Sequence, residues 1–412
     1  MNIAFFFESD INPIKGGTER VTWSVAKYLI SKGMKVVFIA HQKRNDFDPS
    51  LLSYHRFLPD SVGYDTLENI RYLQNLIQDE GIDILVNQGG LSDEIKLCNK
   101  KVLQDRVKIV SVIHYGILED LRYFKEFLRV QFIWNKPFIF IESLLRYLRM
   151  PLLKKKAVKN RKNQLSFLYR YSDAIVLLSE GFKDDFLQFV KNAKKEKLFV
   201  IPNPNTYEKI YEQSLKHKDN IVLYVGRLSY SQKRVDRLIS IWKNLESQFP
   251  EWKFLIIGDG PERKQLEDLA LKYKLTHISF LGYQDPEIYY QKARILCMSS
   301  TYEGFGMVLT EAMQHKVVPI AFGSYKALHD IVEDKKNGFV IPPFDLSVYA
   351  SRLSLLMKDS RLWTRLAENA QEKVLEFDIE KVGERWLDLF QRISLSRKLD
   401  EYEKIVDNNS GL

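Results

Sequence analysis

The chain has 412 residues, of which 45% are hydrophobic, so it is too long for one compact core and too apolar for a disordered protein. Its two cysteines, Cys98 and Cys297, are far apart, which excludes a disulfide framework and a cysteine-rich metal site and favours a reducing compartment. The net charge is +9, but residues 122–162 hold twelve Lys or Arg against two Glu, so the basicity is concentrated in one segment.

No targeting or membrane-spanning segment is expected. The first residues have neither a basic stretch nor a small-residue cleavage site, and they are typical of a buried strand. The longest apolar stretch, 130–145, is interrupted by Lys136, Pro137 and Glu142 and falls short of a bilayer span. The sequence therefore predicts a cytoplasmic protein.

In the first half of the chain, short apolar runs alternate with amphipathic stretches. Between the first two runs, Val21, Val25 and Leu29 share one face of a predicted helix. Continuously apolar strands separated by helices predict a parallel sheet covered on both sides. The predicted strands are 2–7, 35–40, 83–87, 108–114, 174–179 and 198–202.

A second series of the same kind follows a polar, proline-containing linker at 204–219. The expected fold is α/β, with two Rossmann-like doubly wound parallel-sheet domains facing across a cleft, at 1–203 and 220–375. The helical pattern of 376–412 suits a segment that packs on either domain. The predicted strands of the second series are 221–226, 253–258, 278–282, 295–299, 317–322 and 338–342.

One candidate ligand site runs from Glu303 to Glu311, after a predicted strand and into a helix. Glycines at 304 and 306 let a ligand approach the backbone, and the first helical turn has unpaired amides that suit a diphosphate. Glu311 is placed to accept hydrogen bonds from ribose, and Glu303 to address a sugar. The alternative is a surface glycine loop with an incidental acidic residue.

This motif resembles the signature of GT-B glycosyltransferases of family 4. Three other stretches agree with that family in order: Lys15-Gly-Gly-Thr18, Gly226-Arg-Leu-Ser-Tyr-Ser-Gln-Lys-Arg234 and Gly258-Asp-Gly-Pro261. The resemblance implies a nucleotide-sugar donor, retention of stereochemistry, and catalytic roles for His114 and Glu303. It implies donor binding by Gly16, Gly17, Arg227, Lys233, Phe305, Gly306, Met307, Val308 and Glu311.

Arg227 and Lys233 have a physical role in this interpretation. A nucleoside diphosphate gains negative charge as it leaves, and two fixed cations stabilise that charge without a metal. Arg suits bidentate phosphate contact and Lys acts as a point charge. No metal and no cofactor are therefore expected, only a nucleotide-sugar co-substrate, with a UDP-hexose as the expected donor.

His114 ends a predicted strand, where ligands of α/β domains bind. The resemblance assigns it a contact with the donor sugar, although Tyr115 follows where the family often has Asp. A histidine with a purely structural role is the alternative.

The basic segment interleaves cations with large apolar residues, and we expect an excursion of the first domain at about 118–165. Such a composition suits a helix in an anionic membrane interface; the alternative is an amphipathic helix packed on its own domain. No nucleic-acid-binding module is recognisable. The expected membrane or acceptor surface is Arg129, Trp134, Lys136, Arg146, Arg149, Lys154, Lys155 and Lys156.

The function hypothesis is transfer of a hexose from a nucleotide sugar to a hydroxyl of a lipid-linked or cell-surface polysaccharide acceptor. The enzyme is expected to be peripheral at the inner face of the membrane. Two alternatives stay open: another GT-B nucleotide-sugar enzyme, epimerase or phosphorylase-like, and a non-catalytic nucleotide-sugar-binding subunit.

Overall fold

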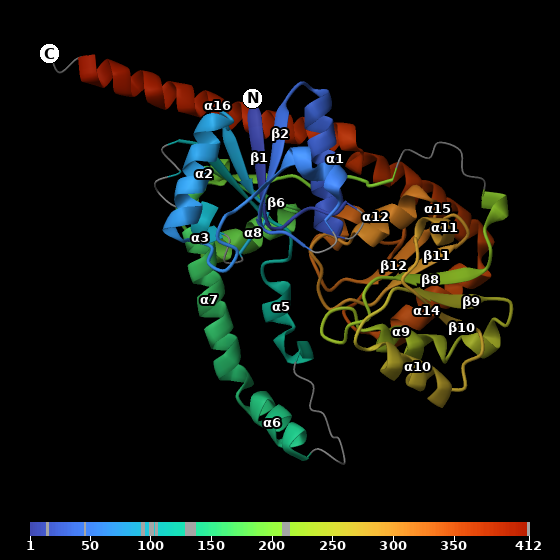
Figure 1. Cartoon of the computed structure of the whole chain (residues 1–412). Helices are drawn as coiled ribbons and strands as arrows, with labels where there is room; N and C mark the ends of the chain where they lie inside the picture. The colour runs from blue at the N-terminus through green and yellow to red at the C-terminus, as the bar shows by residue number, and fades with distance from the viewer. Residues whose placement is uncertain are drawn as a thin grey trace. The chain divides into compact units, whose positions relative to one another are not determined.

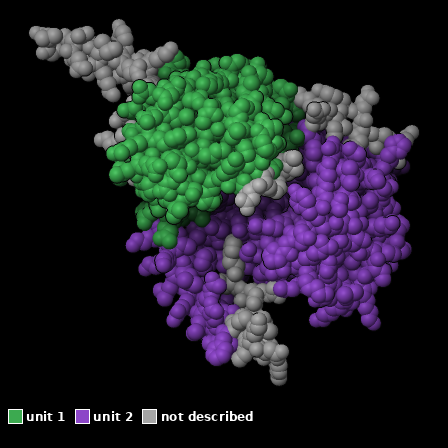
Figure 2. Space-filling model, in the orientation of Figure 1, with its two compact units in different colours: residues 1–114, 160–206, 377–412 green, residues 115–159, 207–376 purple. Residues whose placement is uncertain are grey.

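The computed structural model describes residues 1–13, 16–44, 47–91, 95–98, 103, 106–127, 137–207 and 215–409. The chain forms two compact units, shown in green and purple in Figure 2. The first unit comprises residues 1–114, 160–206 and 377–412, and the second comprises residues 115–159 and 207–376.

The first unit contains a seven-stranded parallel sheet in the order β3-β2-β1-β4-β5-β6-β7. The chain starts in the middle of the sheet, so the direction of winding reverses between β1 and β4, which pair directly. The strands are β1 (Asn2–Ser9), β2 (Lys35–Gln42), β3 (His55–Phe57), β4 (Ile84–Asn87), β5 (Lys108–Ile113), β6 (Ala174–Leu177) and β7 (Leu198–Val200).

Helices cover both faces of this sheet (Figure 1). On one face, Val25 and Leu29 of α1 pack with Val382 and Trp386 of α16 against the strands. On the other face, Leu73 and its neighbours in α2 form a second cluster. The helices are α1 (Gly17–Ser31), α2 (Leu67–Asp79), α3 (Ile95–Cys98), α8 (Glu180–Phe189) and α16 (Ile379–Asn409), with 3-10 turns η1 (Pro49–Tyr54) and η3 (Lys195–Lys197).

The C-terminal helix α16 belongs to the first unit, which is one of the two positions that the sequence left open. Gly383 allows the close approach of α16 to α1, because a Cβ there would lie 2.3 Å from the Tyr28 ring. The Tyr28 hydroxyl donates a hydrogen bond to Glu384 Oε1 at 2.5 Å. The last helix therefore contributes to the same hydrophobic core as the first two strands and α1.

The second unit contains a six-stranded parallel sheet in the order β10-β9-β8-β11-β12-β13. Its winding reverses between β8 and β11, and one cluster of buried residues packs around it. The strands are β8 (Ile221–Val225), β9 (Lys253–Ile257), β10 (Ile278–Gly282), β11 (Ile295–Met298), β12 (Val318–Phe322) and β13 (Phe339–Ile341). The helices are α9 (Val235–Trp242), α10 (Arg263–Lys272), α11 (Glu287–Tyr290), α12 (Met307–Gln314), α13 (Leu328–Ile331), α14 (Leu346–Lys358) and α15 (Ser360–Val374), with turns η4 (Leu215–His217), η5 (Glu246–Gln248) and η6 (Leu375–Phe377).

Residues 115–159 group with the second unit, although the sequence predicted an excursion of the first domain at about 118–165. The physical reason lies in α5 (Glu119–Arg122) and the turn η2 (Phe124–Phe127). Glu119 Oε1 accepts a hydrogen bond from the Lys326 amide at 3.1 Å, and the Tyr123 ring packs edge-on against Phe344.

The segment continues with α6 (Pro137–Leu148) and α7 (Met150–Tyr171), and the unit boundary falls within α7. In the described ranges, no helix is both long enough and apolar enough to cross a bilayer.

Candidate functional site

Glu303 lies in the loop between β11 and α12, and its side chain is 9% exposed. Its Oε1 accepts hydrogen bonds from Lys233 Nζ at 2.5 Å and from Ser300 Oγ at 2.6 Å, while Oε2 accepts one from Gln232 Nε2 at 3.3 Å. A buried carboxylate is stable as an anion only when it is paired in this way. The carboxylate is thus held in one orientation at the carboxyl edge of the sheet.

The loop after β8 brings Lys233 and Arg227 to the same edge. Arg227 is exposed, and its Nη2 lies 3.5 Å from Gln232 Oε1, the amide that also contacts Glu303. The two loops are joined by their backbones, since the Thr301 amide donates to the Gln232 carbonyl at 2.7 Å. The structure therefore brings together Arg227, Lys233 and Glu303, which the sequence analysis selected from separate motifs.

The glycine turn at 258–260 packs against the backbone of the loop that contains Arg227. Gly258 has a φ of 126°, and a Cβ there would lie 2.0 Å from the Gly226 carbonyl oxygen. A side chain at this position would displace the backbone next to Arg227. The turn therefore makes a close backbone contact that requires glycine at position 258.

Gly306 forms the start of α12 in the left-handed conformation, with a φ of 95°. A Cβ at this position would lie 2.6 Å from the Tyr325 hydroxyl, so only glycine fits. Phe305 is buried, whereas Met307 and Val308 are partly exposed in the first helical turn. In that turn the Leu309 amide donates to the Gly306 carbonyl at 2.8 Å. The amides of Met307 and Val308, at the first two helical positions, have no preceding helical carbonyl as acceptor, which suits an anionic ligand.

Two buried tyrosines line the environment of Glu303. Burial, and then the negative charge of Glu303, raise the pKa of Tyr325 and the pKa of Tyr224 well above the usual range. Both hydroxyls therefore stay protonated, and Tyr224 donates to the Arg227 carbonyl at 3.1 Å.

Glu311 lies inside the second unit on α12 and is 1% exposed. Its Oε2 accepts a hydrogen bond from the Tyr290 hydroxyl at 3.2 Å. Contact with a ribose would require a ligand to reach this buried carboxylate, so the expected role of Glu311 stays a prediction.

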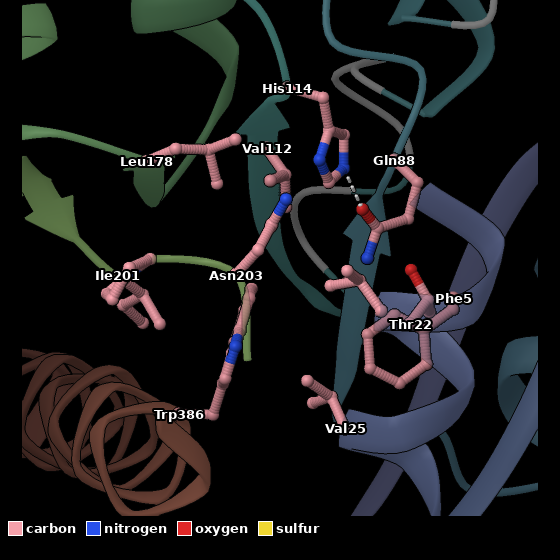
Figure 3. A pocket seen from close by; sticks show the side chains of 12 residues that line it. Phe5, Thr22, Val25, Gln88, Val112, His114, Leu178, Ile201, Asn203 and Trp386 are labelled. Carbon is pink, nitrogen blue, oxygen red and sulfur yellow. Dashed lines mark hydrogen bonds between the residues drawn. The ribbon is translucent and has the colours of Figure 1, made fainter. Parts of the chain in front are cut away.

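His114 lies in the first unit, directly after β5, and Figure 3 shows it beside Gln88 in a small pocket. His114 Nε2 is 2.5 Å from Gln88 Oε1, so the ring donates from Nε2, and Nδ1 is buried without a hydrogen-bond partner among the described residues. Burial lowers the pKa of His114 to about 4, so the imidazole is neutral at physiological pH.

The pocket has room for roughly one water molecule, which is too little for a sugar ring. A sugar contact of His114 therefore stays a prediction. The other lining residues are mostly apolar: Phe5, Val21, Thr22, Val25, Val112, Leu178, Ile201, Pro202, Asn203 and Trp386.

Gly16 and Gly17 lie at the start of α1, also in the first unit, with Gly16 extended at a φ of −115°. Glu19 in the first turn accepts a hydrogen bond from the Asn12 amide at 2.7 Å and pairs with Arg44 at 3.1 Å. The glycine loop is thus anchored on its helix side, while Lys15 lies outside the described residues.

A buried ion network beside the site was not predicted from the sequence. Glu126 Oε2 accepts hydrogen bonds from Arg234 Nη1 at 2.8 Å and from Arg237 Nη2 at 2.7 Å. Arg237 also donates to the Ser299 carbonyl at 3.3 Å and stacks 3.9 Å from the Phe344 ring centroid. Burial, and then the charge of Arg234, lower the pKa of Arg237 to about 10, which leaves it protonated at neutral pH.

Two signals in the sequence point to this network. Glu126 is one of only two acidic residues in the basic segment, and Arg234 and Arg237 are spaced to share a helix face after Lys233.

Of the expected membrane surface, Arg146 on α6, Arg149 between the two helices and residues 154–156 on α7 are exposed. The remaining members, Arg129, Trp134 and Lys136, lie outside the described residues. Among the positions that the structure describes, no group of three or more His, Cys, Asp or Glu is placed to hold a metal ion.

Two family models match consecutive parts of the chain: Glycosyltransferase Family 4 over residues 15–205 and Glycosyl transferases group 1 over residues 206–373. The chain belongs to the group 1 glycosyltransferases. The first model covers Gly16, Gly17 and His114 of this group 1 glycosyltransferase, and the second covers Arg227 and the Glu303 loop.

Solved structures confirm the GT-B fold of this group 1 glycosyltransferase. The Anabaena protein HepE in complex with UDP and glucose superimposes with a TM-score of 0.72 over 95% of this chain and 100% of that chain. The sequences are 17% identical, so the likeness concerns the fold alone. The two parallel-sheet Rossmann-like domains of this chain match that structure.

Curated relatives of this group 1 glycosyltransferase come from several bacteria. A Campylobacter jejuni α-1,4-N-acetyl-D-galactosaminyltransferase, named for a GalNAc-containing diNAcBac-PP-undecaprenol acceptor, is 30% identical over 55% of this chain and 62% of its own length. The amylovoran biosynthesis glycosyltransferase AmsD of Erwinia amylovora is 30% identical over 54% of this chain and 63% of its own. An uncharacterized Haemophilus influenzae glycosyltransferase is 26% identical over 90% of this chain and 95% of its own length. The first two matches thus span less than two thirds of those relatives.

Proposed function

We propose that the chain is a retaining glycosyltransferase that moves a hexose from a nucleotide sugar, UDP-linked, to a hydroxyl of a lipid-linked or polysaccharide acceptor. The observation that carries the proposal is the held carboxylate of Glu303, with Lys233 at 2.5 Å and Arg227 beside it, at the start of α12. This arrangement combines an anion for the sugar with cations for a departing diphosphate.

The cations supply the electrostatic part of the reaction. As the glycosidic bond breaks, negative charge grows on the diphosphate, and fixed positive groups stabilise it in the transition state. The guanidinium of Arg227 is exposed and, among the described residues, makes only a long contact, 3.5 Å, with Gln232, so it suits two parallel hydrogen bonds to phosphate oxygens. Together with the first-turn amides of α12, these groups support a transfer that needs no metal.

For the transfer itself we favour a front-face path. The acceptor hydroxyl attacks the anomeric carbon on the side from which the diphosphate departs, and its proton passes to a phosphate oxygen. In this path Glu303 holds the sugar without bonding to it covalently, and its hydrogen bonds with Lys233 and Ser300 keep the carboxylate in place. His114, as a neutral imidazole, offers a hydrogen bond without adding charge.

Relatives support the donor and acceptor classes. The Campylobacter jejuni relative is named for an undecaprenol-linked acceptor, and one relative from Staphylococcus aureus for poly(ribitol-phosphate). Two fold neighbours, HepE and TarM, were solved with UDP. A membrane-held or polymeric acceptor and a peripheral location at the inner membrane face follow as proposals for this chain.

Donor choice is tested by thermal unfolding with a panel of UDP-, GDP- and ADP-sugars. A tight donor stabilises by mass action, so a UDP-hexose is expected to raise the unfolding midpoint more than the other nucleotide sugars. The same donor is then incubated with and without candidate acceptors. Release of UDP only when an acceptor is present supports transfer, whereas an interconverted nucleotide sugar or binding without turnover contradicts it.

A further inference from the structure

The segment α6–α7 forms an exposed arm, defined here as residues 137–163. Helical hydrogen bonding continues across the junction, since the Arg149 amide donates to the Leu145 carbonyl and the Leu153 amide to the Arg149 carbonyl, both at 3.0 Å. The two helices follow one another in Figure 1. The arm is therefore a nearly continuous helical rod that is interrupted only at Arg149, between α6 and α7.

The first part of the rod carries an apolar stripe that faces water. Its members are spaced by three or four residues, which places them on one side of a helix. Large apolar side chains in folded proteins are usually buried, but these are exposed. A contiguous exposed apolar surface of this kind marks an interaction site. The stripe consists of Phe138 (82% exposed), Ile141 (50%), Leu145 (45%), Leu148 (66%) and Leu152 (70%).

The same side of the rod becomes cationic further along. Lys155, Lys156 and Lys159 continue the three- and four-residue spacing from Leu152, and all are exposed. The opposite side of α7 is buried at Leu165 and Leu168 in the first unit. This face is thus apolar in the first part of the rod and basic after Leu152. The C-terminal end of α7 is held in place by its packing in the first unit.

The charge of the rod selects the kind of partner. Between residues 137 and 171 the acidic side chains are limited to Glu142, whereas nine Lys or Arg are present. A second copy of such a surface would be repelled, while an anionic surface would be attracted. An apolar region followed by cations is the pattern of a helix that lies in a membrane interface.

We propose that this face of the α6–α7 arm docks on a bilayer of anionic phospholipid. Phe138, Leu148 and Leu152 enter the boundary between headgroups and acyl chains. Lys155, Lys156 and Lys159 lie at the level of the lipid phosphates. The apolar part supplies adsorption, and the lysines supply the preference for anionic lipid.

A membrane-held acceptor is part of the proposed function, and this face brings the enzyme to it. Docking is measured as binding, without any transfer of sugar. An enzyme that binds vesicles but transfers nothing contradicts the proposed function alone, and an active enzyme that ignores vesicles contradicts the docking face alone.

Flotation of the full chain with phosphatidylcholine vesicles, with and without phosphatidylglycerol, tests the proposal. Neutralising Lys155, Lys156 and Lys159 with Gln is expected to reduce binding to anionic vesicles roughly fivefold per lysine. The pair Phe138→Ser and Leu152→Ser is expected to abolish it. Matched changes on α10, Leu271→Ser and Lys272→Gln, lie at exposed positions and should leave binding unchanged.

Insertion is tested with an environment-sensitive fluorophore on a single introduced cysteine, because native Cys98 and Cys297 are buried. On Leu152→Cys the emission is expected to shift to the blue with anionic vesicles. On Asn163→Cys, about 16 Å further along the same face, it should stay unchanged. Equal shifts at both sites, no shift at either, or self-association in place of vesicle binding would overturn the proposal.

Discussion

At the scale of single residues, Glu303 shows how a buried charge is kept available for a ligand. Lys233 compensates its charge, and Ser300 and Gln232 satisfy further lone pairs. In the proposed function a donor diphosphate competes with Glu303 for Lys233, so we expect donor binding to affect the orientation of Glu303. We therefore expect the rate of transfer to depend more on the charge of residue 303 than on its size.

Replacing Glu303 with Gln, which keeps the size and removes the charge, is expected to lower transfer by on the order of 10²-fold or more, because charge stabilisation in the transition state is lost. The measurement is the rate at saturating donor, together with the thermal unfolding midpoint, which checks that the variant is folded. Glu251→Gln, at an exposed position of the same unit, is the control. Near-normal turnover in Glu303→Gln would refute the assigned site.

His114 makes the stability of the protein depend on pH. Its folded-state pKa is about 4, below the ordinary value of 6.5, so the unfolded chain binds the extra proton between these values. Stability is therefore present in full above pH 6.5 and falls as the pH drops toward 4.

We expect the free energy of unfolding to fall by roughly 1–3 kcal/mol more in the wild type than in His114→Gln when the pH is lowered from about 7 to about 4.5. Denaturant titrations at the two pH values measure this difference. His217→Gln, at an exposed histidine, should behave as the wild type. Identical pH dependence in the wild type and His114→Gln would show that the ring is not held neutral by burial.

The sequence predicts those site residues best that lie close together along the chain. Glu303 and Gly306 belong to one contiguous motif, so their proximity follows from the chain itself. Lys233 and Arg227 lie near Glu303 because both follow β8, which ends at the same edge of the sheet as β11. Glu126 was missed because its isolated position among cations does not identify its partners, which lie more than 100 residues further along the chain.

At the scale of elements, Glu126 joins three pieces of the second unit. It links the turn η2 to Arg234 at the start of α9, and through Arg237 to the Ser299 carbonyl at the end of β11. Lys233 precedes Arg234, and Glu303 follows Ser299 by four residues. The network therefore fixes the two loops that hold the candidate site.

Glu126→Gln is expected to lower the free energy of unfolding by about 1–3 kcal/mol, because two guanidinium groups lose their shared carboxylate. It should also raise the KM for the donor, since the loop with Lys233 becomes less fixed. Chemical denaturation and donor titration measure the two effects. Glu142→Gln, at the exposed acidic residue of the same segment, should change neither; equal behaviour of both variants would exclude a positioning role.

The strands themselves were largely predictable, because a strand buried on both faces reads as a continuous apolar run. Residues 278–282 and 221–226 match β10 and β8 closely. The strand missed was β3, at His55–Phe57. It lies at the sheet edge, is three residues long and contains His55 and Arg56, so it has too little apolar character to stand out.

At the scale of the whole molecule, each unit is assembled from separate stretches of the chain. The sequence predicted two domains from the two series of strands but left the position of 376–412 open, because a helical stripe does not specify which surface covers it. The structure places Trp386 and Phe390 in the core of the first unit, next to residues from β1 and α1.

Trp386→Ala is expected to cost the first unit about 3–5 kcal/mol, the usual range for removing a buried tryptophan. Scanning calorimetry should then show an earlier transition for the first unit and little change for the second. Leu395→Ala, at a 61% exposed position of the same helix, is the control. A single unshifted transition in Trp386→Ala would mean that α16 contributes no core.

The return of α16 to the first unit also has a consequence for synthesis on the ribosome. Domains generally fold as units, in the order in which they emerge. Here α1 covers one sheet face of the first unit early, but α16, which packs on the same face, is missing until residues 379–393 have been translated, whereas the second unit is complete by then. The nascent first unit therefore leaves part of an apolar sheet face uncovered during translation, and chaperones are expected to bind it at that stage.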